Sequence, residues 1–208
     1  MNKWIKDLAL SALAGMSVAL GGVVFLSCEN KVIGSMLFSI GLFMVCSFGF
    51  NLFTGKVCYC AGNPPAYIGW LGLVWVGNLI GAQLTAWAVG ATRIGPALAE
   101  KAAALSAVKT GDGFVSLFIL GIFCNMMIYV GVESYKAIPY EMGKYVGMVL
   151  CIMVFILSGF EHCVADMFYF AMGNAWSAQS VIALIVITLG NSLGGLTIPF
   201  LRNFKVKE

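Results

Sequence analysis

Charged residues are scarce in this chain. Lysine and arginine number 12 and aspartate and glutamate 9, so 10% of the 208 residues are charged, against 61% that are hydrophobic. A soluble domain carries about 25% charged residues, so this chain has too little polar surface to fold as one. Its charge-free windows reach about 20 residues or more, the length that crosses a bilayer core. They are Leu8–Cys28, Val32–Gly55, Val57–Thr92, Gly113–Val132 and Met167–Leu201. This pattern predicts an all-α polytopic membrane protein.

Histidine is rarer still, with the single copy His162. One histidine without a second clustered metal-binding motif argues against a metal site. The seven cysteines are odd in number and most lie in apolar segments, so they do not form a disulfide framework. A phosphate-binding loop is also absent from the sequence, which argues against ATP-driven pumping. We expect no cofactor and no nucleic-acid partner.

The apolar segments predict six transmembrane helices in one channel domain, 1–208. We expect helices at 8–27, 33–61, 67–91, 113–135, 144–172 and 179–201, the second and fifth being interrupted by polar residues. The connection at 92–112 is expected to be a loop that separates three helices from three. The two halves then cover about 1–91 and 113–202.

Basic residues are unevenly divided between the two sides of this six-helix arrangement. One side carries Lys3, Lys6, Lys136, Lys144, Arg202, Lys205 and Lys207, and the other Lys31, Arg93, Lys101 and Lys109. Cytoplasmic loops carry the excess of lysine and arginine. The sequence therefore predicts a protein of the cytoplasmic membrane with both termini in the cytoplasm.

Two short patterns recur in the two halves. SFGFNLFT at 47–54 resembles LSGFEHCV at 157–164, and GNLIGAQL at 77–84 resembles GNSLGGLT at 190–197. Three helices per half make the second half insert upside down, which predicts an inverted repeat. The two polar interruptions then meet near the bilayer midplane, where non-helical backbone must be buried in protein or line a water-filled cavity.

The only histidine lies within SGFEHCVADM at 158–167, between two apolar runs. An ionisable residue at membrane depth is a functional candidate because its burial is costly. Glu161, with Gly159, is expected to be structural, its carboxylate accepting free N–H groups at the helix break. Asp166 would share a helical face with His162, and would either pair with it or lie at the membrane surface.

These motifs resemble those of the formate/nitrite transporter family, which includes formate, nitrite and hydrosulfide channels. The resemblance covers nearly the whole chain and is carried by SGFEH followed by DMF at 166–168, by LFTG at 52–55 and by LGIFCN at 120–125. It implies an aquaporin-like six-helix fold and a homopentamer with one pore in each protomer. It also implies conduction of small monovalent anions of weak acids, not catalysis.

The resemblance implies roles for individual residues. His162 would be the central pore histidine, which shares or donates a proton, with Thr54 facing it and Asn125 as its partner. Lys109, in the loop before the fourth helix, would add positive potential to the pore. Apolar constrictions would be formed by Phe38, Leu42, Leu52 and Phe53 on one side and by Phe155 on the other. Asp166 departs from the family pattern, in which many members carry asparagine here.

Other functions stay open on the sequence alone. The six-helix inverted repeat also suits a channel for neutral solutes, although NPPA at 63–66 has no counterpart in the second half. A proton-coupled anion carrier is not separable from a channel, because permeation of a weak acid mimics proton coupling. An enzyme with Cys163 as nucleophile would need a base on a neighbouring turn, and the adjacent His162 does not face it.

Overall fold

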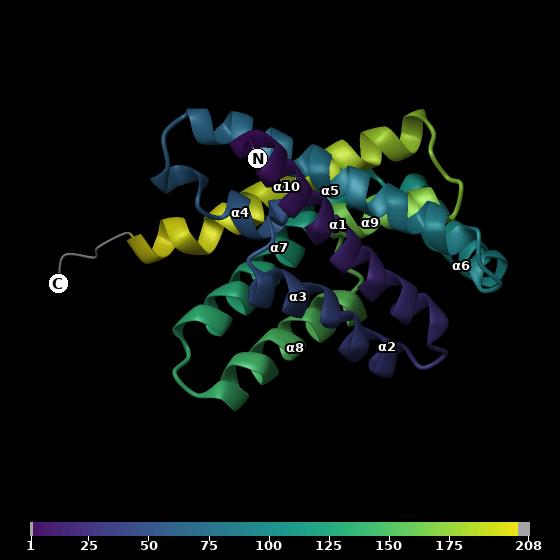
Figure 1. The fold of residues 1–208 in the computed structure, drawn as a ribbon, viewed down its shortest axis with the longest axis horizontal. Helices are drawn as coiled ribbons and strands as arrows, with labels where there is room; N and C mark the ends of the chain where they lie inside the picture. The colour runs from purple at the N-terminus through teal and green to yellow at the C-terminus, as the bar shows by residue number, and fades with distance from the viewer. Residues whose placement is uncertain (1, 204–208) are drawn as a thin grey trace.

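The computed structural model describes residues 2–203, which form helices and connections and contain no strand. Lys205 and Lys207, which entered the count of basic residues, lie outside the described range. The helices are α1 Lys3–Ser27, α2 Lys31–Phe38, α3 Ile40–Phe48, α4 Phe53–Val57, the 3-10 turn η1 Cys60–Gly62, α5 Ala66–Gly90, α6 Gly95–Gly111, α7 Phe114–Ala137, α8 Glu141–Leu157, α9 Cys163–Met172 and α10 Ala178–Asn203. Their arrangement is shown in Figure 1.

Five helical segments in the described range are long and apolar enough to cross a membrane. They are Lys3–Ser27, Lys31–Phe48, Ala66–Gly90, Phe114–Ala137 and Ala178–Arg202. Their outward faces carry large apolar side chains, among them Trp87 at 65% and Val115 at 73% exposure. Water would penalise such an apolar surface, whereas lipid would not. The predicted all-helical architecture with several apolar spans is therefore present.

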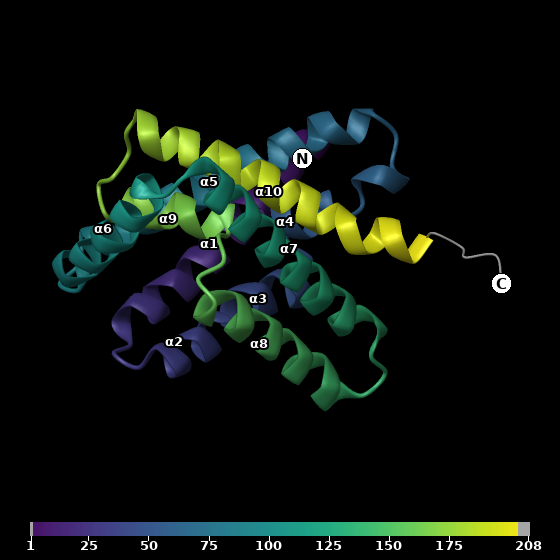
Figure 2. The same cartoon turned by 180° about the vertical axis from the view of Figure 1, so that it is seen from behind.

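Two pairs of long helices form the frame of the molecule. Helix α1 packs along α5, and α7 packs along α10; the first pair can be followed in Figure 1 and the second in Figure 2. A Cβ atom added at Gly81 of α5 would overlap the carbonyl of Ala12, and one added at Gly194 of α10 would overlap that of Ile122. Small residues let helix backbones approach this closely inside a membrane. The repeated GNxxG motif therefore serves helix packing.

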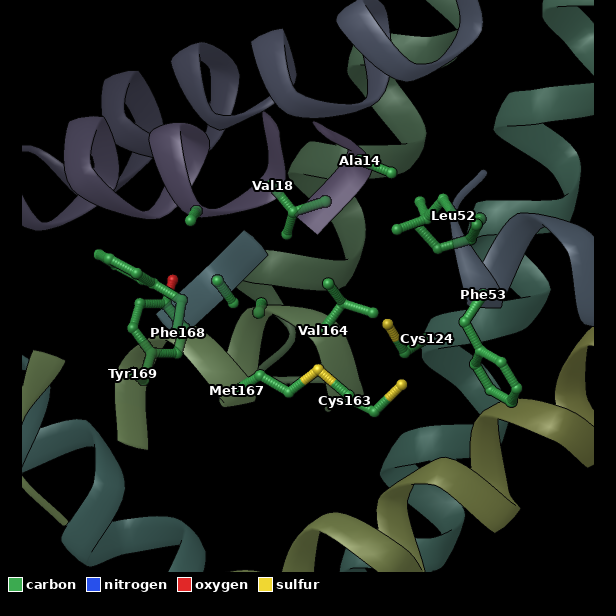
Figure 3. Packing of buried hydrophobic residues seen from close by; sticks show 14 of the residues in the cluster. Ala14, Val18, Leu52, Phe53, Cys124, Cys163, Val164, Met167, Phe168 and Tyr169 are labelled. Atoms are coloured by element: carbon green, nitrogen blue, oxygen red, sulfur yellow. The ribbon is translucent and has the colours of Figure 1, made fainter. Parts of the chain in front are cut away.

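Helix α9 runs through the centre of this frame. All ten of its residues are buried. Figure 3 shows its side chains Cys163, Val164 and Met167 in the same buried cluster as Val18 of α1 and Phe53 of α4. A helix that is enclosed on all sides has to be apolar around its whole circumference, and α9 is so except at Asp166.

Helical structure stops at equivalent glycines in the two halves. Gly49 after α3 has φ +68°, and Gly159 after α8 has φ +71°. At each stop the next residue, Phe50 or Phe160, donates its N–H to the carbonyl five positions earlier, at 3.0 and 2.9 Å. This bond and the left-handed backbone define a Schellman C-cap, which favours glycine because a Cβ is disfavoured there. The chain is then extended until α4 and α9 begin.

The expectation of a loop at 92–112 was wrong, because Gly95–Gly111 forms helix α6. The segment GPALAEKAAALSAVKTG starts with proline in the first turn and is rich in alanine, both of which favour a helix. Its low hydropathy separates it from the spanning helices but does not prevent helix formation. Lys109 consequently projects from the last turn of a helix and not from a loop.

Candidate functional site

A cavity of about 800 Å³ opens between the α1–α2 turn, α6 and the α8–α9 connection. Its wall combines aromatic rings with charged side chains: Phe25, Phe38, Phe155, Phe160, Tyr169, His162, Glu29, Lys31, Lys101, Lys109, Glu161 and Asp166 contribute to it. A largely apolar cavity with a few convergent polar groups is the usual form of a small-ligand site. Among residues 2–203, no three His, Cys, Asp or Glu side chains are grouped to hold a metal ion.

His162 is buried at the start of α9, with 3% of its surface exposed. Its Nε2 lies 2.9 Å from Oγ1 of Thr54, and its Nδ1 lies 3.1 Å from the backbone N–H of Ala165. A backbone N–H can only donate, so Nδ1 is the acceptor and carries no proton. The ring is therefore neutral with its proton on Nε2, which donates to Thr54. The positive end of α9 also disfavours an imidazolium here.

Aromatic rings surround the histidine. The Phe155 ring stacks on the His162 ring with a centroid distance of 5.8 Å, and Phe38 meets Phe155 edge-on at 6.0 Å. Both phenylalanines are buried and both line the cavity. We call Phe38 and Phe155 the aromatic collar. Phe38 therefore lies beside Phe155 and not with Leu42, Leu52 and Phe53, in contrast to the grouping that the resemblance implies. Those three residues are buried but do not line this cavity.

Asn125 contacts the histidine only indirectly. Its Nδ2 donates to the backbone carbonyl of Thr54 at 3.1 Å and to that of Asn191 at 2.7 Å. No hydrogen bond joins it to His162, in contrast to the role that the resemblance implies. Its buried Oδ1 has no hydrogen-bond partner within residues 2–203. Asn125 therefore fixes the carbonyl of the residue that holds the histidine.

Lys109 forms ion pairs with both carboxylates of the 158–167 segment. Its Nζ binds Oε2 of Glu161 and lies 2.9 Å from Oδ1 of Asp166. The side chains of Lys109, Glu161 and Asp166 are 12%, 8% and 1% exposed. Burial lowers the pKa of the Lys109 ammonium, but the neighbouring Asp166 and Glu161 raise it by more than burial lowers it. The pKa of Lys109 therefore lies above its ordinary value. The ammonium also lies 5.8 Å from the centre of the Tyr169 ring.

This cluster corrects two expectations from the sequence. The carboxylate of Glu161 binds Lys109 and does not cap the broken helix. The N-terminus of α9 is capped instead by Nδ1 of His162. Asp166 neither pairs with His162 nor lies at a surface, because it is buried against Lys109. The spacing of residues within α9 cannot reveal this ion pair, because Lys109 belongs to α6 and lies more than 50 positions earlier in the chain.

Asn78 of α5 holds the extended backbone between α3 and α4. Its Nδ2 donates to the carbonyls of Ser11 and Asn51 at 2.8 and 2.9 Å. Its Oδ1 accepts the N–H of Phe53, the first residue of α4, at 2.8 Å. A buried extended segment needs partners of this kind for its peptide groups.

Asn191 of α10 makes the same set of bonds between α8 and α9. Its Nδ2 donates to the carbonyls of Gly121 and Glu161, both at 2.8 Å, and its Oδ1 accepts the N–H of Cys163 at 2.9 Å. These three partners and those of Asn78 are each 110 positions apart. Both asparagines belong to the repeated GNxxG motif, but the motif alone does not reveal this role.

Comparisons with known proteins give the family and the fold of the chain. The sequence model of the formate/nitrite transporter family matches residues 1–204. A probable formate transporter of Methanothermobacter thermautotrophicus is 31% identical over 91% of this chain and 84% of its own length. The nitrite transporter NirC of Escherichia coli (strain K12) is 30% identical over 92% and 78%. A solved structure described as a pentameric formate channel with formate bound shares the fold, with TM-score 0.81, 24% identity and coverage of 96% and 95%.

Proposed function

The chain belongs to the formate/nitrite transporter family, and from this premise we propose that it is a channel for small monovalent anions of weak acids, such as formate, nitrite or hydrosulfide. It is a multi-pass membrane protein of a family of transporters and channels, not of enzymes. One observation carries the proposal: the single histidine is buried, neutral and directed at Thr54, beside an aromatic collar in a cavity that also contains a cation.

We propose that 1–208 forms one domain of six spans in two inverted halves, about 1–91 and 113–202. In this arrangement α2 and α3 with α4 form the second span, and α8 with α9 the fifth. The equivalent hydrogen bonds of Asn78 and Asn191 support the repeat, because each set holds one extended segment to two helices of its own half. By analogy with the pentameric formate channel of the same fold, we propose a homopentamer with one pore per protomer.

The proposed orientation places both termini in the cytoplasm. The cavity then faces away from the cytoplasm, because Lys31 and Lys101, which line it, belong to the side with fewer basic residues. An anion arriving from that side meets the N-terminal end of α9, which favours negative charge, and the Lys109 ammonium, which is already in contact with Glu161 and Asp166. Leu42, Leu52 and Phe53, buried near the first break, are proposed as the constriction on the other side.

The energetic obstacle is the apolar collar formed by Phe38 and Phe155. A bare charge among aromatic rings is far costlier than a neutral molecule of the same size. His162 lowers this cost by offering its Nε2–H to the anion in place of Thr54. Full donation of that proton would leave an imidazolate in the collar, because Nδ1 is occupied as an acceptor. We therefore propose that His162 shares its proton in a hydrogen bond.

The proposal is tested in proteoliposomes that contain the purified protein. Formate, nitrite and hydrosulfide are added in turn, and uptake is followed by internal pH and by swelling. We expect uptake of at least one anion by the wild type and none by His162→Phe, with Tyr140→Phe, at an exposed aromatic position, as the control. Unchanged uptake by His162→Phe would contradict the role of the histidine. Permeation of glycerol without any anion would replace the proposal by a neutral-solute channel.

A further inference from the structure

The cluster of Lys109, Glu161 and Asp166 contains one cation and two carboxyl groups. Both carboxyl groups contact the same ammonium, and all three side chains are almost fully enclosed. If both carboxyl groups were ionised, the cluster would carry a net negative charge in a region of low dielectric. An uncompensated buried charge is strongly disfavoured, and two close carboxyl groups relieve it by retaining a proton.

The contacts of Asp166 also point to a proton. Its side chain is 1% exposed, and its buried Oδ2 accepts no hydrogen bond from residues 2–203. The carboxyl groups of Asp166 and Glu161 lie close to each other, because each contacts the same Nζ atom of Lys109. Two ionised carboxylates only repel at this distance, whereas a carboxylic acid donates to a carboxylate.

The neighbouring groups do not supply a second positive charge. From α9 and α7 the cluster is faced by Tyr169, Cys163 and Cys124, which are neutral acids, and His162 is held in its neutral form. The ammonium of Lys101, which also lines the cavity, donates to the carbonyl of Leu26 at 2.7 Å.

Two further charged side chains line the cavity, Glu29 and Lys31, and they are opposite in sign. Within the described residues, Lys109 is the only cation that pairs with Glu161 or Asp166.

We propose that Glu161 and Asp166 share one proton over Lys109, and that this carboxyl pair delivers the proton to the anion before it reaches His162. The inference rests on the proposed channel function and adds the source of the proton. Both carboxyl groups line the same cavity as His162 and the aromatic collar, so an anion beside Lys109 is also beside the acid. His162 is unsuited to this step, because its Nε2 proton is the only one that it holds.

The transfer is balanced in protons and charge. The carboxyl O–H bond breaks, its electron pair stays on the carboxylate, and a new bond forms to an oxygen of formate or nitrite or to the sulfur of hydrosulfide. The neutral acid then passes the collar while it accepts the hydrogen bond of His162. A hydronium ion from the aqueous side of the cavity restores the carboxyl proton. One proton therefore moves with each anion.

Asp166→Asn tests this role in the proteoliposome assay. The variant retains the Lys109–Glu161 pair but has no proton to give. We expect formate uptake to fall about 100-fold at about pH 7.5, and by much less at about pH 5.5, where hydronium is about 100 times more abundant. Asp166→Glu should restore uptake at the higher pH. Asp112→Asn, in the α6–α7 connection, is the matched control and should behave as the wild type.

The outcomes separate this inference from the proposed function. A wild type that transports none of the anions would overturn the function itself. A wild type that transports formate, with Asp166→Asn unchanged at both pH values, would overturn only the proton role. Infrared spectroscopy of the wild type needs no variant to fold: we expect the carbonyl band of one protonated carboxyl at neutral pH, and its absence would contradict the shared proton.

Discussion

Replacing Asn191 by alanine is expected to destabilise the protein strongly. The side chain is fully buried and joins three helical regions through its bonds to Gly121, Glu161 and Cys163. Alanine removes all three hydrogen bonds and leaves two carbonyls and one N–H without their partner. The Glu161 carbonyl and the Cys163 N–H have no helical partner to replace it, because they belong to the extended segment before α9 and to the first residue of α9.

The size of the effect follows from the number of bonds. Side-chain hydrogen bonds between helices of membrane proteins contribute about 0.6 kcal/mol on average and up to about 1.7 kcal/mol. The peptide groups around Asn191 stay buried when their partner is lost, so each bond should lie at the upper end of that range. We therefore expect a loss of about 3–5 kcal/mol, which changes the unfolding equilibrium by roughly 150- to 5,000-fold.

The measurement is equilibrium unfolding in mixed micelles with a rising fraction of SDS, followed by tryptophan fluorescence. Ser192→Ala is the matched control, because within the described part of the chain that hydroxyl bonds only to Thr188 of its own helix, at 2.8 Å, and its loss should cost less than about 1 kcal/mol. Asn78→Ala should cost about as much as Asn191→Ala, since its bonds are equivalent. A cost for Asn191→Ala no larger than that of the serine control would refute the reasoning.

Three further perturbations test other parts of the site. His162→Asn keeps an acceptor for the N–H of Ala165 but loses the Nε2 donor. The free energy of unfolding should therefore change by less than about 1 kcal/mol, while anion uptake is lost. A variant that loses its stability together with its uptake would show that the ring is only structural. Lys109→Gln leaves two buried carboxyl groups without their cation, and should cost about 3–5 kcal/mol in the same unfolding assay and slow uptake; Lys109→Arg should retain both. Gly194→Leu should prevent the packing of α10 on α7 and abolish folded protein in size-exclusion chromatography, whereas Gly62→Leu, at a site with no atom within 4 Å of an added Cβ, should not.

The spanning helices were predictable from the sequence because hydropathy is a local property. Charge-free windows marked every long apolar helix, and the glycines at 49 and 159 marked where helices stop. The error at α6 had a local signal too, since its alanines and its proline favour a helix. The low hydropathy of that segment indicates only that it does not span the membrane, and not that it lacks helical structure.

The polar contacts of the site were less predictable, because they join segments far apart in the chain. The resemblance indicated that Thr54 faces His162, but not which ring nitrogen points to Thr54. Because the backbone N–H of Ala165 donates to Nδ1, the nitrogen that points to Thr54 is Nε2. Asp166 has a local neighbour in His162, and the structure pairs it instead with Lys109 from another helix. Short-range spacing restricts which residues share a helical face, but not which helix is packed against that face.

The geometry also separates two tasks that a single pore histidine would otherwise have to combine. A group that donates a proton must be able to hold a spare one, and therefore must tolerate a change of charge. A group inside an apolar collar must keep its charge constant, because a change of charge there, with no counter-ion in contact, costs far more than one beside the Lys109 ammonium. His162 meets the second condition, since its Nδ1 is bound to a backbone N–H and its neutral ring is fixed. The carboxyl pair meets the first, since it holds a spare proton, and both carboxylates stay in contact with Lys109 until a hydronium ion restores that proton. Proton transfer before the collar and hydrogen bonding within it are therefore assigned to different residues by their surroundings.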